Sequence, residues 1–126
     1  MSAPLSTPEP AAAGREAAAG NEAAAGTFLL APSADGHFAA AGPLTFATAR
    51  RAREIGLRCL AQAPQGALEI DCADVKPSDS AGLAVLLDWL GAAKRAGRTL
   101  RYTRLPEELT ALGHISEVDD LLTRGV

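Results

Sequence analysis

The chain has 126 residues, 48% of them hydrophobic, and a formal net charge of −3 at pH 7. This length favours a single folded domain. The slightly acidic balance argues against nucleic-acid binding by bulk charge, because phosphate neutralisation needs a basic surface. No apolar run reaches the roughly 18 residues of a transmembrane helix, and no basic, Leu-rich secretory signal begins the chain, so we expect no direct membrane insertion.

The first part of the chain is a low-complexity leader. Residues 1–26 hold 10 of the 28 alanines, and AAAG occurs three times between positions 11 and 26. A glycine in every repeat disfavours helix, and almost no large apolar side chain is available to offset the entropy of ordering. We therefore predict that 1–26 is disordered and that 27–126 forms the domain. The alternative is a tether that folds onto a partner.

The domain is predicted to begin with a β-hairpin. Residues 27–31 are typical of a short strand ended by Pro32, and Asp35-Gly36 suits a tight turn. Residues 37–41 are predicted as the returning strand, which we expect Gly42-Pro43 to end. The first two strands are therefore expected to be antiparallel.

A first helix is predicted from Thr45, as its N-cap, to a stop at Pro64. Small and apolar residues share one face of this helix: Ala52, Ile55, Gly56, Cys59, Leu60 and Ala63. The opposite face carries Arg50, Arg51, Glu54, Arg58 and Gln62. Such a charged face is more typical of solvent exposure than of a site.

The second half of the chain alternates strand and helix signals. These are a strand at 67–72, a loop at 76–79, a helix at 80–96 stopped by Gly97, a strand at 99–103, a helix from Pro106, and a last short helix or edge strand at 118–122. The order β-β-α-β-α-β-α predicts an α/β fold with a mixed, mostly parallel sheet of four or five strands, a leading hairpin, and three or four helices.

The turn from Val75 to Leu83 joins a strand to the strongest helix signal. In an α/β sheet this turn lies at the carboxyl edge, where ligands and partners usually dock. Either Asp79 or Ser80 can cap the helix. The free N–H groups there can also hold an anion, and a phosphate on Ser80 would suit the helix dipole although Asp79 would oppose it. The residues alone favour a simple capping role for Ser80.

The segment Asp79-Ser80-Ala81-Gly82-Leu83, after a strand and before an apolar helix, resembles the signature of STAS domains. The resemblance extends over most of 27–126 and implies a STAS, anti-sigma factor antagonist-like fold. In the antagonists of that family, the residue at the position of Ser80 is presented to a partner kinase for phosphorylation. The resemblance thus implies Ser80 as a phosphoacceptor and a sigma-factor-regulating kinase as one partner.

A finer resemblance is to the MlaB family, carried by the run 80–90, by Leu44-Thr45-Phe46 and by Leu105-Pro106-Glu107. MlaB-like proteins are small cytoplasmic STAS subunits of a phospholipid transport system that maintains outer-membrane lipid asymmetry in Gram-negative bacteria. The resemblance implies a protein held peripherally at the inner membrane by an ABC transporter complex, where it binds and supports the MlaF-like ATPase subunit. It makes Ser80 a contact with that ATPase rather than necessarily a phosphoacceptor.

We expect the partner surface to lie around the start of this helix. It would comprise Ser78, Asp79, Ser80, Ala81, Ala84 and Asp88, with Arg50, Arg51 or Arg53 as charges at its rim. The single tryptophan, Trp89, either packs under the neighbouring helix or anchors the partner, since tryptophan is enriched in interface hot spots.

Enzymatic activity is not expected. The only histidines, His37 and His114, belong to no recognisable catalytic motif and are expected at the surface. Cys59 and Cys72 form no CxxC pair and no metal-ligand spacing, which favours reduced structural thiols. We therefore expect no catalytic residue, metal ion or cofactor.

Overall fold

The computed structural model describes residues 26–64 and 66–126, so the predicted disorder of 1–26 falls almost wholly outside the described residues. The elements follow in the order β1 (Leu29–Ala34), β2 (His37–Leu44), α1 (Ala49–Gln62), β3 (Leu68–Ser78), α2 (Ser80–Arg95), β4 (Leu100–Thr103), α3 (Glu107–Ile115) and α4 (Asp119–Arg124). The predicted α/β order is confirmed, and the last apolar segment is a short helix.

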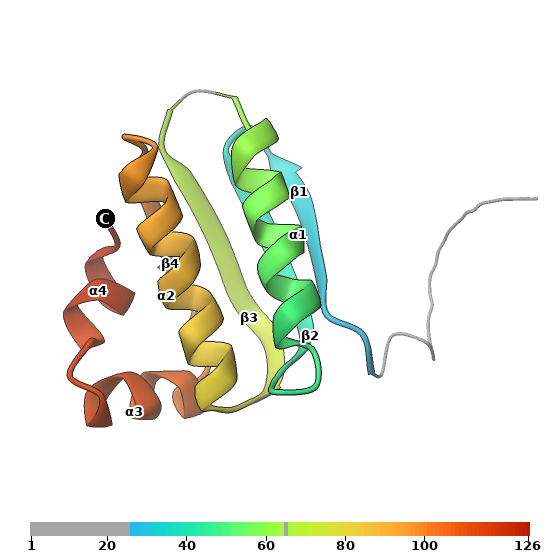
Figure 1. Ribbon diagram of the computed structural model, residues 1–126, viewed down its shortest axis with the longest axis vertical. Helices are drawn as coiled ribbons and strands as arrows, with labels where there is room; N and C mark the ends of the chain where they lie inside the picture. Colours follow the sequence, from blue (N-terminus) through green and yellow to red (C-terminus); the bar gives the residue numbers. More distant parts are fainter. Residues whose placement is uncertain (1–25, 65) are drawn as a thin grey trace, which may run out of the picture.

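The four strands form one mixed sheet in the order β1-β2-β3-β4. The leading hairpin β1–β2 is antiparallel, whereas β2–β3 and β3–β4 are parallel. Figure 1 shows α1 and α2 side by side over one face of this sheet, with α3 and α4 beside α2 at the β4 side. The carboxyl ends of β2 and β3 therefore lie close to the first turns of α1 and α2.

The first three strands are longer than the sequence predicts. β1 continues through Pro32, which an edge strand tolerates because its outward backbone needs no partner. β2 continues through Gly42-Pro43 to Leu44, and the register with β3 shifts at that point, so a bulge accommodates the proline. β3 runs through the predicted loop at 76–79 as far as Ser78.

Helix α1 begins later than predicted, because Thr45 is not its N-cap. The Thr48 hydroxyl accepts from the Thr45 N–H (3.0 Å) and donates to the Pro43 carbonyl (2.9 Å). These bonds close a turn over residues 45–48, and the helix starts at Ala49 with Thr48 at the cap position. The turn therefore stands outside the helix.

The core lies between the helical layer and one face of the sheet. Along β3 the side chains of Leu68, Ile70 and Cys72 are buried, while Glu69 and Asp71 between them point to the other face. Trp89 is fully buried, and its indole N–H donates to the Arg53 carbonyl of α1 (3.3 Å). Trp89 therefore packs under the neighbouring helix, and its alternative role as an exposed anchor is wrong.

Gly56 allows α1 to approach Trp89. A Cβ atom at Gly56 would lie 2.0 Å from Trp89 Cε2, far inside contact distance.

We expect Gly56→Ala to lower the free energy of unfolding by about 1–3 kcal/mol or more, because the overpacked helix must shift. The matched control is Gly91→Ala on α2, where the nearest atom is the flexible end of Arg95 at 3.3 Å. It should be neutral or stabilising by up to about 1 kcal/mol in urea denaturation. Equal losses in the two variants would contradict this account of the helix contact.

Candidate interaction surface at the start of helix α2

Asp79 joins the two helices where they begin. Its Oδ1 accepts from the N–H groups of Ala81 (2.9 Å) and Gly82 (3.1 Å), so Asp79 is the N-cap of α2. Its Oδ2 accepts from the Phe46 N–H (3.0 Å) in the turn before α1. The bond from Phe46 and the two bonds from α2 lower the pKa of this carboxyl, because they stabilise its charged form.

Ser80 is the first residue of α2 and is exposed. Since Asp79 performs the capping, the Ser80 hydroxyl makes no hydrogen bond to any of the residues that the structure describes. The capping role that the residues alone favoured for Ser80 is therefore wrong. A free hydroxyl at the first turn of a helix can instead bond to a partner.

Gly82 has a structural reason to be in this turn. A Cβ atom there would lie 2.1 Å from the Leu44 carbonyl oxygen at the end of β2. Backbone cannot move aside as a flexible side chain can, so only glycine lets α2 begin this close to the sheet. Leu44 is fully buried beneath it. The serine and alanines beside this glycine thus stand on a tightly seated helix end.

Ser78 differs from the other predicted contact residues. Its side chain is buried, with 4% exposure, and both its N–H and its hydroxyl donate to Glu108 Oε1, each at 3.0 Å. The structure therefore removes Ser78 from the accessible surface. It supports the turn from within by tying the end of β3 to α3.

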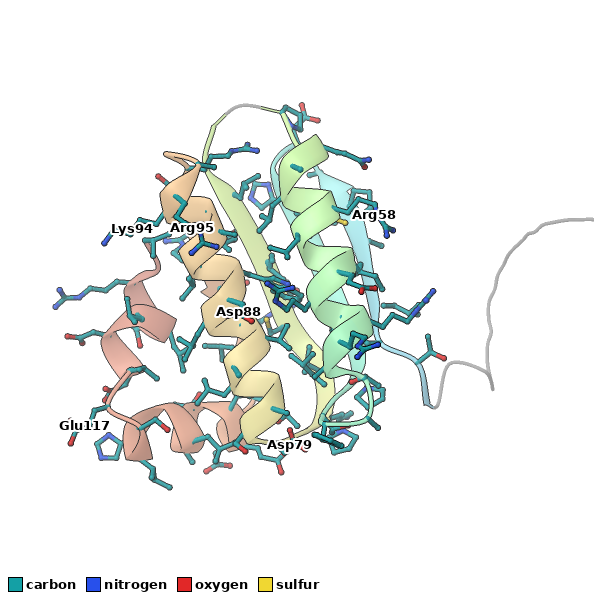
Figure 2. The ribbon with its side chains drawn as sticks, viewed as in Figure 1. Arg58, Asp79, Asp88, Lys94, Arg95 and Glu117 are labelled. Carbon is teal, nitrogen blue, oxygen red and sulfur yellow. The ribbon has the colours of Figure 1, made fainter. Side chains whose placement is uncertain are left out.

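The remaining predicted residues form one exposed stripe on α2. Ser80, Ala84 and Asp88 are exposed at successive turns, and Ala81 beside them is half-buried. Asp88 Oδ2 pairs with Arg53 Nε of α1 at 3.1 Å, and both side chains remain about half exposed, at 53% and 51%. Figure 2 shows Asp79 at the end of the molecule where α2 begins and Asp88 midway along the same helix. We call Ser80, Ala81, Ala84 and Asp88 the α2 stripe.

The three predicted rim arginines differ in their surroundings. Arg50 and Arg51 are exposed on the first turn of α1, and within the described part of the chain neither forms an ion pair. Arg53 is occupied by Asp88. The exposed arginines therefore add unpaired positive charge beside the α2 stripe.

Sequence reasoning missed Phe46 as a surface residue. A helix that begins at Thr45 would include Phe46, but Phe46 lies in the turn before α1 and is 86% exposed. No local signal distinguishes this from a core position, since an aromatic residue two places after Leu44 also fits an apolar pattern. Its backbone N–H bonds to Asp79, 33 residues away in the sequence, in the turn outside the helix.

The histidines and cysteines are placed as expected for structural or surface residues. His37 and His114 are exposed and lie 3.2 Å and 3.1 Å from carboxylate oxygens of Glu69 and Asp119, respectively. Both cysteines are free thiols, and burial raises the pKa of Cys72 to about 12. Among residues 26–64 and 66–126, no three His, Cys, Asp or Glu side chains gather as a metal site would require.

None of the helices that the structure describes is long and apolar enough to cross a membrane. In a comparison with protein families, the family described as "Mlab, STAS domain" matches residues 29–123 of the chain. A comparison with curated proteins finds none that matches. The family match spans all four strands and nearly the whole described region, so it covers the α2 stripe together with the sheet that supports it.

Asp79 should stabilise the fold through its charged form. We expect Asp79→Ala to lower the free energy of unfolding by about 1–2 kcal/mol at neutral pH, because α2 loses its cap and the turn loses its tie. The pKa of Asp79 is lowered in the folded state. Its contribution is therefore present above the ordinary carboxyl pKa of about 3.9, and it is lost as pH falls through the lowered folded value.

The measurement is urea denaturation of both proteins from pH 7 down to pH 3. The matched variant Asp79→Asn keeps one capping oxygen but cannot accept on both sides, so it should lose less stability than Asp79→Ala. A difference between wild type and Asp79→Ala that grows as pH falls would contradict the assignment.

Proposed function

The chain belongs to the MlaB-like STAS domain family, and on that premise we propose that it is a non-enzymatic subunit that binds the ATPase of a phospholipid-trafficking ABC transporter. The observation that carries the proposal is the free Ser80 hydroxyl at the head of the exposed α2 stripe. The same residue is the contact that the family resemblance implies. In this proposal the chain is held at the inner membrane through the transporter, as part of the apparatus that maintains lipid asymmetry in the outer membrane.

The geometry suits docking by a rigid helix. Ala81 and Ala84 have only methyl side chains, so a partner element can approach the α2 backbone closely. Ser80 and Asp88 supply polar atoms at the two ends of the stripe. Because Asp79 already orders the first turn, little conformational entropy remains to be lost when the partner binds.

The effect on the ATPase would follow from mass action. A subunit that binds the assembled, competent conformation of the ATPase more tightly than other conformations stabilises that conformation. Phospholipid movement and ATP hydrolysis would then remain tasks of the transporter, and this chain would set how much of the ATPase is competent. No catalytic group on this chain is needed for that role.

The test is the affinity of the purified full chain for the ATPase subunit of its host's transporter. We expect wild type to co-purify with it, and Ser80→Arg and Asp88→Arg each to raise Kd by about tenfold or more, because a long cation would fill the docked stripe. The matched control is Ala111→Arg, an exposed position on α3. Its Kd should stay within about twofold of wild type.

Two results would contradict the proposal. One is the absence of any complex with the wild-type chain. The other is equal weakening by Ala111→Arg and Ser80→Arg, which would show that the α2 stripe has no special part in binding. Thermal unfolding of each variant is measured alongside, because all three positions are exposed and should tolerate the change.

A second candidate is an anti-sigma factor antagonist that a kinase switches by phosphorylating Ser80. The exposed hydroxyl on the first turn of α2 favours it, since the helix dipole stabilises a phosphate there. Incubation with the host's sigma-factor-regulating kinase and ATP, read by intact mass, decides the matter. The gain of one phosphate in wild type and none in Ser80→Ala would support this function. No gain in wild type would exclude it.

A further inference from the structure

Phe46 is the most exposed large apolar side chain among the described residues, at 86%. Three others are exposed, Leu29 at 50%, Ile115 at 76% and Leu121 at 43%. Phe46 differs from them because it lies in the turn that Asp79 ties to the first turn of α2, where the α2 stripe begins. An aromatic ring left in water beside a candidate interface has an unused capacity for apolar burial.

Hydrogen bonds within and beyond the turn hold the backbone that carries Phe46. The Phe46 N–H donates to Asp79 Oδ2 (3.0 Å), the Thr45 N–H donates to the Thr48 hydroxyl (3.0 Å), and that hydroxyl donates to the Pro43 carbonyl (2.9 Å). The backbone that presents the ring is therefore fixed before any partner arrives. Binding has to restrict only the ring's own two side-chain torsions, so its apolar burial is gained at low entropic cost.

Two arginines of α1 follow the ring closely in the sequence. Arg50 and Arg51 follow it on the first turn of α1, both exposed and neither in an ion pair with a described residue. The nearby Asp79 carboxylate is already taken by three backbone N–H groups. A partner that covers Phe46 therefore meets two unpaired guanidinium groups beside it.

We propose that Phe46 is the anchor of the interface: it enters an apolar socket on the ATPase subunit, and carboxylates at the rim of that socket pair with Arg50 and Arg51. This inference rests on the proposed function and adds to it the chemistry of the partner surface. Aromatic residues and arginine are both enriched in protein–protein interfaces. In this proposal the α2 stripe sets how the partner is positioned along the helix. Phe46 contributes most of the apolar surface that is buried on binding.

The first arm of the test compares two exposed apolar residues. With the purified full chain and the ATPase subunit, Phe46→Ala should raise Kd by about 30-fold or more, as loss of a hot spot does. Ile115→Ala, at the end of α3, should change Kd by less than about twofold. Both variants should keep the wild-type melting temperature, because neither side chain is part of the core.

The second arm tests the charge of the socket's rim. Arg51→Glu should slow association at low salt by about tenfold, and the deficit should shrink as salt is raised, because salt screens exposed charges. The matched control Arg124→Glu makes the same change at the far helix, α4, and should leave the association rate nearly unchanged. Faster association of Arg51→Glu would mean a basic rim and would overturn the proposal.

The outcomes separate this inference from the proposed function. If wild type binds and Ser80→Arg weakens binding, but Phe46→Ala behaves like Ile115→Ala, the anchor is refuted while the proposed function stands. If wild type does not bind the ATPase, both are refuted. Binding that depends on Phe46 and on Arg51, with the controls unaffected, supports the socket.

Discussion

The carboxylate of Asp79 is the interaction on which the surface of this protein depends. It accepts three backbone N–H groups from two segments that are far apart in the sequence, the turn before α1 and the first turn of α2. Each of those N–H groups would otherwise face solvent or need another acceptor. The Asp79 side chain thus joins the turn before α1 to the first turn of α2. As a consequence, the distance between Ser80 and Phe46 is held constant.

The layer beneath this tie is held by close approaches that only glycine permits. Gly82 brings the start of α2 against the Leu44 carbonyl, and Gly56 brings α1 against Trp89. At the other end, Arg98 donates to the carbonyls of Leu60 (2.9 Å) and Ala63 (3.1 Å) and so closes the end of α1. Because Arg98 follows the end of α2, these bonds tie the far ends of α1 and α2 to each other as well. Their outward side chains form a fixed pattern, which is what a docking surface needs.

The sequence predicted the parts of the fold that depend on local chemistry. Helix α2 was expected within one residue of its observed end, because its leucines repeat at helical spacing and Gly97 stops it. The sequence placed the strand ends at Pro32 and before Pro43, because proline lacks the backbone N–H that a neighbouring strand normally accepts from. A proline ends a strand only where the neighbouring strand needs that N–H. An edge position and a bulge remove that need.

The errors in the candidate site have a different cause, since they involve contacts between residues distant in the sequence. Ser78 is buried because Glu108, 30 residues later, accepts from it. Phe46 lies in a turn outside the helix, and its N–H bonds to Asp79, 33 residues away. The failure of Thr45 as a cap is the local exception, since the Thr48 hydroxyl that closes this turn is only three residues away. No periodicity of a single segment encodes such pairs. Residue types and spacing could nominate Ser80 and Asp88, but not separate them from Ser78.

Net charge also conceals a feature that matters for binding. Helices α1 and α2 carry six cations, Arg50, Arg51, Arg53, Arg58, Lys94 and Arg95, against two carboxylates, Glu54 and Asp88. The stretch from α3 to α4 carries five carboxylates, Glu107, Glu108, Glu117, Asp119 and Asp120, against Arg124. Figure 2 places Arg58 and Arg95 on the helical layer and Glu117 at the far corner.

The domain is therefore electrically polar although its charges nearly cancel. A polar domain turns in the field of an approaching charged surface, and an acidic partner would meet α1 and α2 first. The net charge of the chain disfavours nucleic-acid binding, but it does not reveal this orientation of the charges. The arrangement of charge on α1 points to the same side of the molecule as the exposed hydroxyl of Ser80 and the ring of Phe46. The exposed, unpaired Arg50 and Arg51, the exposed ring of Phe46 and the free hydroxyl of Ser80 all belong to the starts of the two helices or to the turn before α1.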